Sequence, residues 1–223
     1  MAKIIQIKNG GALNTLNKIS VIITAGGSST RFGENKLLYP LDNKPLILNT
    51  IEKFINIADE IVISTSSEIE KIVAKKYPKI KFAQGGNCRQ QSVLNALEKL
   101  EYKDYVLIHD GARPFITEEI IKKTIKEVKE KKAVVVGIKA VDTVKIYNKK
   151  NEIISTPDRN TLFYAQTPQA FEYDLIYKAH KKFEKELENF TDDSSLLEKL
   201  NYKVYFIEGN YSNKKITVKE DLI

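Results

Sequence analysis

Basic side chains follow a glycine-rich turn in the stretch "VIITAGGSSTRFGENK" at residues 21–36. A hydrophobic run ends there at Gly26 and Gly27, and Arg31 and Lys36 come next. Paired glycines let backbone N–H groups approach an anion closely, while arginine and lysine both bind phosphate. The stretch has neither the Gly-Lys-Ser/Thr end of a P-loop nor G-x-G-x-x-G spacing. It predicts a phosphate-binding loop, and a surface turn with solvated basic side chains is the alternative.

A second polar segment, "HDGARPF" at residues 109–115, also follows an apolar run. Asp110 suits a metal ion or a ribose hydroxyl, and Arg113 suits a substrate phosphate or a pairing with Asp110 itself. The alternative is an Asp-Gly turn with a surface ion pair. We expect His109 to pack at the strand end, and His180, in a basic helical stretch, to lie on the surface.

The segment "QGGNCRQQS" at residues 84–92 places Gly85 and Gly86 between an expected strand and an expected helix. Backbone groups at such a helix start can bind a nucleobase, although a simple tight turn explains the glycines equally well. Cys88 is interpreted as a small packing residue, because no histidine lies near it in sequence. Further on, "FTDDSS" offers two candidate helix caps, Asp192 and Asp193.

These segments lie between alternating apolar and helical patterns, which must position them. The patterns predict strands at 19–24, 60–65, 79–84, 104–110, 133–138 and 203–209. They predict helices at 45–57, 68–77, 89–100, 117–132, 171–187 and 195–200. Two capping boxes are expected, Thr65 with Glu68 and Thr217 with Glu220.

The alternation predicts an α/β, Rossmann-like fold with a mostly parallel sheet and helices on both faces. The rhythm breaks at residues 142–157, where two apolar runs flank the polar turn "NKKN" and predict a β-hairpin. In an open α/β sheet, ligands bind beyond the carboxyl ends of the strands. The polar segments that follow the strands are therefore the expected site.

Composition limits the function further. The 223 residues carry a net charge of +7, which suits anionic ligands, and include one cysteine. A disulfide framework is excluded, so a reducing, cytoplasmic location is expected. No run approaches the roughly 20 apolar residues of a membrane span, and we expect no membrane partner. We also expect no nucleic-acid partner, because the lysine-rich stretch at 122–132 alternates in sign as a solvated helix face does.

Five motifs occur in order along the chain: "HDGARPF", "AVDTVK", "DRNTLFYAQTPQAF", "TDDSSLLE" and "NKKIT". Together they resemble the cytidylyltransferase family of the methylerythritol phosphate route to isoprenoids, from residue 19 to about residue 222. The resemblance implies one nucleotidyltransferase domain of the nucleotide-diphospho-sugar transferase type, with residues 1–17 as an extension. It also implies a homodimer in which a β-arm, at about residues 140–163, completes the partner's substrate site.

In that family, methylerythritol 4-phosphate attacks the α-phosphorus of CTP, and pyrophosphate leaves. No protein nucleophile takes part, and the implied cofactor is Mg²⁺ or another divalent cation. The resemblance assigns charge stabilisation to Arg31, Lys36 and Lys215. It assigns CTP binding to Ala25, Gly26, Gly27, Ser28, Ser29, Gly85, Gly86, Arg89, Ser92 and Asp110. It assigns the sugar-alcohol phosphate to Asp110, Arg113, Thr143, Arg159, Thr167, Thr191 and Asp192, with Asp110 also the possible metal ligand.

Two alternatives stay open on the sequence. Ribitol 5-phosphate cytidylyltransferases share "RPFIT", "AVDT", "QTPQ" and "YSNKKIT", whereas "DRNTLFYA" and "TDDSSLLE" favour the methylerythritol substrate. A catalytically silent nucleotide-binding protein is the alternative of a different class. Arg31, Lys36, Asp110 and Lys215 argue against it, because binding alone does not require all four charges.

Overall fold

The computed structural model describes residues 17–27 and 32–222. The predicted N-terminal extension and three predicted site residues, Ser28, Ser29 and Arg31, lie outside the described residues, apart from residue 17 of the extension.

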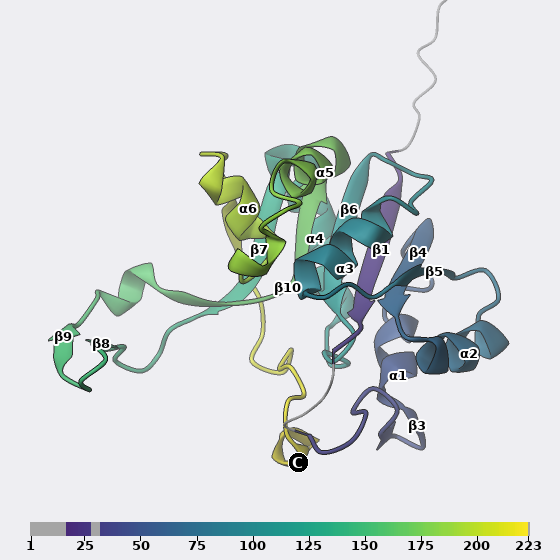
Figure 1. The fold of residues 1–223 in the computed structure, drawn as a ribbon, viewed down its shortest axis with the longest axis horizontal. Helices are drawn as coiled ribbons and strands as arrows, with labels where there is room; N and C mark the ends of the chain where they lie inside the picture. Colours follow the sequence, from purple (N-terminus) through teal and green to yellow (C-terminus); the bar gives the residue numbers. More distant parts are fainter. Residues whose placement is uncertain (1–16, 28–31, 223) are drawn as a thin grey trace, which may run out of the picture.

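A twisted central sheet organises the described part of the chain, with seven strands in the order β11-β7-β10-β6-β1-β4-β5 (Figure 1). Its strands are β1 (Ile19–Ala25), β4 (Glu60–Thr65), β5 (Lys81–Gln84), β6 (Tyr105–Asp110), β7 (Ala133–Lys139), β10 (Phe163–Glu172) and β11 (Tyr205–Glu208). Strand β10 runs antiparallel to both of its neighbours, β6 and β7, and the other pairings are parallel. The predicted mostly parallel α/β fold is confirmed.

Helices cover both faces of this sheet because its central strands are apolar on both sides. Ile23 of β1 and Leu107 of β6 pack in one core, whereas their chain neighbours Ile22 and Ile108 pack in the other. Adjacent strand residues point to opposite faces, so a continuous apolar run fits a sheet that is buried on both sides. One core includes residues of α1 (Leu46–Glu52), α2 (Ser67–Lys76) and α4 (Glu118–Lys131). The other includes α3 (Arg89–Leu97), α5 (Tyr173–Lys182) and α6 (Ser194–Lys199).

Shorter elements connect these layers. They are β2 (Pro40–Leu41), β3 (Lys44–Pro45), β8 (Ile146–Tyr147), β9 (Ile153–Ser155) and the 3₁₀ turns η1 (Arg159–Thr161), η2 (Leu187–Asn189) and η3 (Lys219–Leu222). None of the helices in the described ranges is long and apolar enough to cross a membrane.

Several local predictions were wrong. Phe171 was predicted to begin a helix, but β10 extends to Glu172 and α5 begins at Tyr173. The chain there pairs on both sides, and tertiary pairing overrides the helical spacing of its apolar residues. His180 was predicted to lie on the surface and is instead fully buried on the inner face of α5.

Neither capping box forms as predicted. The residue before α2 is Ser66, and no side-chain cap bond forms there. At the C-terminal turn, the carboxylate of Asp221 accepts hydrogen bonds from the backbone N–H groups of Thr217 and Val218. A carboxylate four residues downstream therefore satisfies these groups in place of the predicted pair.

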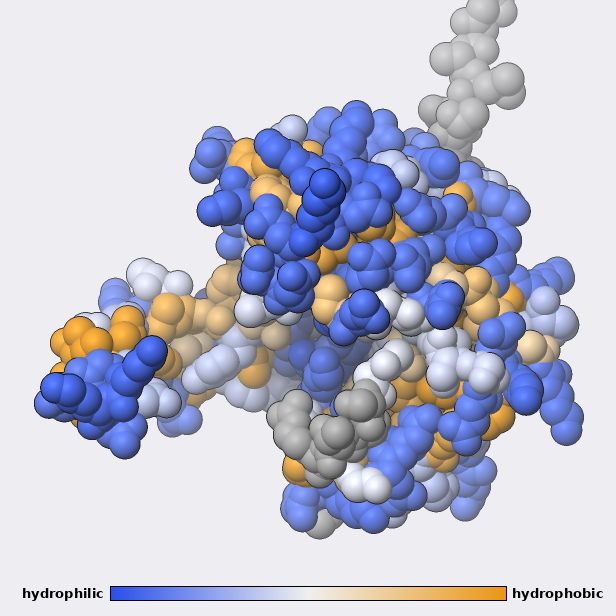
Figure 2. Space-filling model, viewed as in Figure 1, coloured by the Kyte–Doolittle hydropathy of each residue, from blue (hydrophilic) through white to orange (hydrophobic). Residues whose placement is uncertain are grey.

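The predicted hairpin projects from the body of the molecule as an arm, with β8 and β9 paired near its tip (Figure 1). Its turn is closed by a hydrogen bond from Asn148 N to Glu152 O, with Asn151 in the left-handed region. The tip shows a patch of apolar side chains in Figure 2. The large exposed apolar residues along the arm are Val141, Ile146, Tyr147, Ile153, Ile154, Phe163 and Tyr164.

Candidate active site

The carboxyl ends of the central strands meet in register and form the floor of a pocket. Thr24 of β1 pairs with Asp110 of β6, and Ala25 pairs with Thr65 of β4. The polar residues that follow each strand are thereby brought to one edge of the sheet, as expected for this fold. The pocket has a volume of about 370 Å³. It is lined by Thr24, Ala25, Gly26, Gly27, Lys36, Leu37, Gly86, Asn87, Cys88, Arg89, Ser92, Asp110, Ala112 and Lys215.

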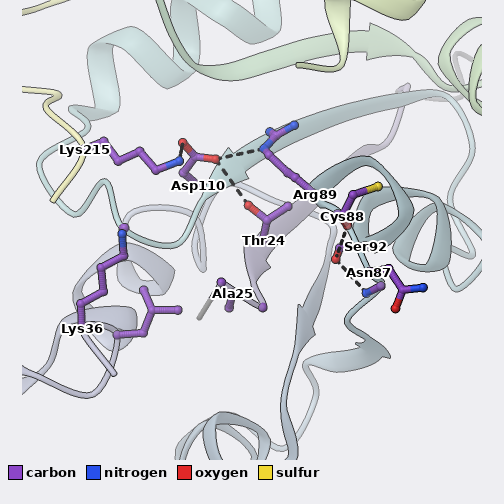
Figure 3. A pocket seen from close by; sticks show the side chains of 14 residues that line it. Thr24, Ala25, Lys36, Asn87, Cys88, Arg89, Ser92, Asp110 and Lys215 are labelled. Carbon is purple, nitrogen blue, oxygen red and sulfur yellow. Dashed lines mark hydrogen bonds and ion pairs between the residues drawn. The ribbon is translucent and has the colours of Figure 1, made fainter. Parts of the chain in front are cut away.

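Asp110 is the electrostatic centre of this pocket. Its Oδ2 lies 3.0 Å from Lys215 Nζ and 3.3 Å from Arg113 Nε, and its Oδ1 lies 3.3 Å from Arg89 Nε. Lys215 and Arg89 approach it from opposite sides in Figure 3. Burial alone would raise the pKa of the Asp110 carboxyl, yet Arg89, Lys215 and Arg113 hold that pKa well below its usual value. One ionised carboxylate therefore faces three cations, which leaves positive charge available for an anionic ligand.

A second pocket of about 270 Å³ shares Arg89, Asp110 and Lys215 with the first. Its other lining residues are Arg113, Ala165, Gln166, Thr167, Gln169, Thr191 and Asp192. Five of the residues predicted on the sugar-phosphate side, Asp110 among them, thus line this pocket, and the charged group at Asp110 lies between it and the predicted CTP side. Arg113, whose partner the sequence left open, pairs with Asp110 and donates to the backbone oxygen of Asn213 at 2.7 Å.

His109 and Thr167 fix the backbone of Asp110 from behind. The Thr167 hydroxyl accepts from Asp110 N at 3.1 Å and lies 3.0 Å from His109 Nδ1, while His109 Nε2 lies 3.1 Å from Arg113 O. A carbonyl oxygen can only accept, so we assign the ring proton to Nε2 and let Nδ1 accept from Thr167. Burial lowers the pKa of His109 to about 4, which keeps this ring neutral. His109 is a packed structural residue, as predicted.

The glycine-rich segment before α3 forms the opposite wall. The Ser92 hydroxyl accepts from Gly86 N at 2.9 Å and donates to Cys88 O at 3.0 Å. A methyl group on Gly86 would fall 2.4 Å from the Gln91 side chain, so only glycine fits this turn. Cys88 caps α3, its Sγ accepting from Gln91 N at 3.4 Å. Gly85, predicted to bind CTP, is outside the residues that line the pocket and packs beside Gly26.

Lys36 and Lys215 reach the pocket from segments far apart in the chain (Figure 3). The loop that carries Lys36 is anchored by buried Phe32 and Leu37. The C-terminal turn binds the same loop, because Lys219 pairs with Glu34 at 2.9 Å. Two of the three predicted charge stabilisers are thus on one pocket wall, and the third, Arg31, lies outside the described residues.

Two predicted substrate residues are on the arm and do not line either pocket. Thr143 is exposed, and Arg159 Nη1 donates to the backbone oxygen of Val141 at 3.0 Å. Their assigned place, in the site of a partner subunit, stays a prediction.

Sequence reasoning missed Gln169 and the role of Asp193. Gln169 Nε2 donates to Asp192 Oδ2 at 2.7 Å, and its Oε1 accepts from the N–H groups of Asp193 and Ser194. Asp193 Oδ2 lies 2.6 Å from Arg89 Nη1. Asp192 caps the start of α6 by accepting from Ser195 N. The signal was present in the adjacent acids of "TDDSS", but their separate partners are set by tertiary structure.

Asp110 is the one carboxylate among the described residues that line the first pocket, and it is paired there with Arg89, Arg113 and Lys215. No group of three or more metal-ligating side chains occurs within residues 17–27 and 32–222. Mg²⁺ typically binds through one or two carboxylates together with substrate phosphates and waters. A single buried carboxylate beside a cationic pocket fits that mode and does not form a closed protein site.

The match to known proteins covers nearly the whole chain. Residues 19–223 match the model of the 2-C-methyl-D-erythritol 4-phosphate cytidylyltransferase family. The chain belongs to this family. A curated member from Clostridioides difficile is 46% identical over 215 residues, which are 91% of this chain and 90% of that protein. A member from Clostridium beijerinckii is 42% identical over 216 residues, 92% and 95% of the two chains.

Solved structures of 2-C-methyl-D-erythritol 4-phosphate cytidylyltransferases are similar in fold. The 4-diphosphocytidyl-2C-methyl-D-erythritol synthase from Anaerococcus prevotii superposes with a TM-score of 0.83 at 35% identity, over 92% of this chain and 95% of that one. The Francisella tularensis cytidylyltransferase gives 0.80 at 30% identity, over 92% and 96%. The family consists of cytidylyltransferases, a class of nucleotidyltransferases, as the motifs predicted.

Proposed function

We propose that this protein transfers CMP from CTP to 2-C-methyl-D-erythritol 4-phosphate, releasing pyrophosphate. The observation that carries the proposal is the group at Asp110, where Arg89, Arg113 and Lys215 converge on one carboxylate at the junction of two pockets. A reaction between two phosphorylated substrates needs such a junction, because it brings two anions into contact.

In this proposal the first pocket holds CTP. Ala25, Gly26 and Gly27 line its wall at the end of β1, where bare backbone allows close approach of a triphosphate. We also assign Ser28, Ser29, Gly86 and Ser92 to CTP, whereas Gly85, which does not line the pocket, packs beside Gly26 and supports that wall. The turn before α3 accepts only glycine at Gly86, because a side chain there would clash with Gln91, and in this proposal its bare backbone faces the cytosine base.

Catalysis then consists of positioning and charge stabilisation. The phosphate of the second substrate lies in the pocket of Arg113, Thr167, Thr191 and Asp192, and its oxygen attacks the α-phosphorus of CTP. Lys36 and Lys215, with Arg31, stabilise the negative charge that develops as the bond to pyrophosphate breaks. The Asp110 carboxylate stays ionised, so it holds Arg89 and Lys215 toward the reacting phosphates and does not take up a proton.

Mg²⁺ is the proposed cofactor, and Asp110 is its proposed protein ligand. The ion would neutralise phosphate charge, while the protein contributes one carboxylate. Asp110 would exchange a contact with Lys215 or Arg89 for the metal when CTP binds.

We propose that the arm of one subunit completes the site of its partner in a homodimer, with Thr143 and Arg159 binding the sugar phosphate. The exposed apolar side chains of the arm support this, since large exposed apolar patches mark interaction surfaces. We also infer a cytoplasmic location, because one cysteine and no disulfide suit a reducing compartment.

The proposed function is tested by measuring pyrophosphate release with a matrix of substrates in Mg²⁺ buffer. CTP, UTP, ATP and GTP are each paired with methylerythritol 4-phosphate and with ribitol 5-phosphate. We expect turnover with CTP and methylerythritol 4-phosphate. Turnover with ribitol 5-phosphate alone would assign the other substrate, and an absence of turnover in every pairing would identify a silent nucleotide-binding protein.

The arm is tested by mixing two impaired variants, Lys215→Ala and Arg159→Ala. If arms are exchanged, the mixed dimer has one site with an intact pocket and an intact arm. With free exchange of subunits, about a quarter of all sites are then intact. At sugar-phosphate concentrations well below KM, where Arg159→Ala alone is also impaired, activity therefore returns to about a quarter of the wild-type value. Activity that stays at the mean of the two separate variants would contradict arm exchange.

A further inference from the structure

A histidine and an aspartate form a buried polar pair behind the pocket. His180 is on α5 and Asp193 directly precedes α6, and both side chains are fully buried. His180 Nε2 lies 3.5 Å from Asp193 Oδ1. Neither ring nitrogen of His180, nor this oxygen, has a hydrogen bond within the described part of the chain. Burying polar atoms without partners is costly, and the 3.5 Å contact is the ion-pair contact that His180 makes with Asp193.

The second oxygen of Asp193 connects this pair to the pocket. Asp193 Oδ2 lies 2.6 Å from Arg89 Nη1, and Arg89 Nε lies 3.3 Å from Asp110 Oδ1. Arg89 lines both pockets, so its guanidinium is at the boundary between them. A continuous line of polar groups therefore leads from the interior of α5 to the proposed CTP site.

Asp193 is held as an ionised carboxylate in a fixed orientation. Its backbone N–H donates to Gln169 Oε1 at 3.1 Å. Burial alone would raise the pKa of Asp193, but Arg89 and His180 hold that pKa below its usual value. An ionised carboxylate with both oxygens free would bind a guanidinium in a bidentate manner. His180 faces one of the two oxygens, and Arg89 contacts the other.

We propose that His180 is a positioning residue for the proposed reaction: by facing Asp193 Oδ1, it restricts Arg89 to Oδ2 and keeps the guanidinium shared between Asp193 and Asp110. Without the imidazole, Asp193 turns both oxygens toward Arg89 and draws it away from Asp110 and the CTP pocket. His180 touches no substrate and acts through Asp193 and Arg89. The kinetic part of this inference rests on the proposed function, whereas the CTP-binding part needs no turnover.

The competing explanation is that His180 merely fills space in the core. Its neighbours on α5, Ile176 and Ala179, are fully buried in the same core, and a leucine would suit that environment. The two explanations differ in what a nonpolar substitution does. Loss of packing lowers stability only, whereas loss of positioning weakens CTP binding and does so only when Arg89 is present.

The test uses two substitutions at one position, His180→Leu and His180→Gln, each made in the wild-type chain and in an Arg89→Ala background. CTP affinity is measured by calorimetry, and kcat and KM by pyrophosphate release. We expect His180→Leu to raise the Kd for CTP about tenfold, the size of one lost hydrogen bond to a charged group, with kcat within about twofold. His180→Gln retains a side-chain donor, so it should bind CTP within about threefold of the wild type.

The Arg89→Ala background identifies the route of the effect. If His180 acts through Arg89, His180→Leu changes the Kd for CTP no further in that background. An equal loss in both backgrounds, or wild-type CTP affinity of His180→Leu, would overturn the proposal.

Asp193→Asn provides a second approach if His180→Leu does not fold. It keeps the size of the side chain and removes the charge that holds Arg89 Nη1. Without that charge Asp193 no longer draws Arg89 away from Asp110 and the CTP pocket, so we expect the Kd for CTP to be no higher than that of the wild type, and a rise of about tenfold would also overturn the proposal. A wild-type enzyme that binds CTP but transfers nothing would refute the proposed function and leave the calorimetric test valid.

Discussion

Arg89 and Arg159 are both assigned to substrates, but the molecule holds them in opposite ways. Arg89 is paired with two carboxylates, Asp110 and Asp193, whose own side chains are buried. Arg159 is on the exposed arm and bonds a backbone oxygen within it. The charged groups of the pocket are therefore positioned by contacts within the same chain. The arm, in contrast, exposes its side chains to the surroundings. Changes in the pocket should affect chemistry and folding, while changes on the arm should affect assembly and sugar-phosphate binding.

Removing a pocket charge should have the largest effect. We expect Lys36→Ala and Lys215→Ala each to lower kcat by about 10²–10³-fold, because each loses a partner of the transition-state charge. Steady-state pyrophosphate release measures this, with Lys214→Ala as a neighbouring control that leaves both pocket lysines in place. Near-normal kcat in both variants would show that Lys36 and Lys215 do not stabilise the transition state.

His109, which is buried behind the pocket, should make the stability of the protein depend on pH. The pKa of His109 is about 4 in the folded chain and about 6.5 in an unfolded one, so the unfolded state binds more protons between these values. His109 therefore contributes stability that is present above pH 6.5 and is lost as the pH falls toward 4. The loss is on the order of 3 kcal/mol for a shift of this size.

Urea unfolding of the wild type and of His109→Gln, at pH 7, 5.5 and 4, isolates this contribution. The difference in unfolding free energy between the two proteins should shrink as the pH falls. A difference that is constant with pH would show that His109 titrates normally in the folded protein.

A substitution on the arm should have a smaller effect, and that effect should differ between the two substrates. We expect Arg159→Ala to raise KM for the sugar phosphate about tenfold, through loss of one charged hydrogen bond, with KM for CTP nearly unchanged. Its unfolding free energy should equal that of the wild type, since the side chain is outside the core. Equal increases in both KM values would show that Arg159 does not bind the sugar phosphate specifically.

The smallest effect is expected from loss of the ion pair that joins the Lys36 loop to the C-terminal turn. Lys219 pairs with Glu34 at 2.9 Å and lies 5.8 Å from the rings of Phe32 and Tyr39, so it bridges the Lys36 loop and the C-terminal turn. The ion pair is exposed, and such pairs contribute little. Lys219→Ala should raise KM for CTP by about twofold at most. A tenfold change would show that this bridge orders the pocket.

Sequence patterns predicted the residues that line the pocket better than the elements that hold those residues in place. Continuous apolar runs identified β1, β4 and β6, and the residues after them, such as Asp110, were correctly expected at one edge of the sheet. Strand β10 was missed, because "FYAQTPQAF" contains a proline and polar residues and lacks strict alternation. Its pairing with both β6 and β7 is a long-range property that no local window contains.

The same limit explains the error at His180. Lysines follow it in sequence, and local reading therefore put it in water. In the fold, the buried face of α5 turns it toward Asp193, thirteen positions later. The sequence likewise did not indicate the partners of Arg89, since Asp110 and Asp193 come from segments on either side of the hairpin.

The central claim is that the pocket at Asp110 joins CTP to methylerythritol 4-phosphate. Phosphorus NMR of the wild-type reaction tests it most directly, because the ester and pyrophosphate are both observed. We expect the cytidine diphosphate ester and pyrophosphate to appear in equal amounts, and Lys215→Ala to form both at least about a hundredfold more slowly. Pyrophosphate without the ester, or an ester formed only from ribitol 5-phosphate, would contradict the account.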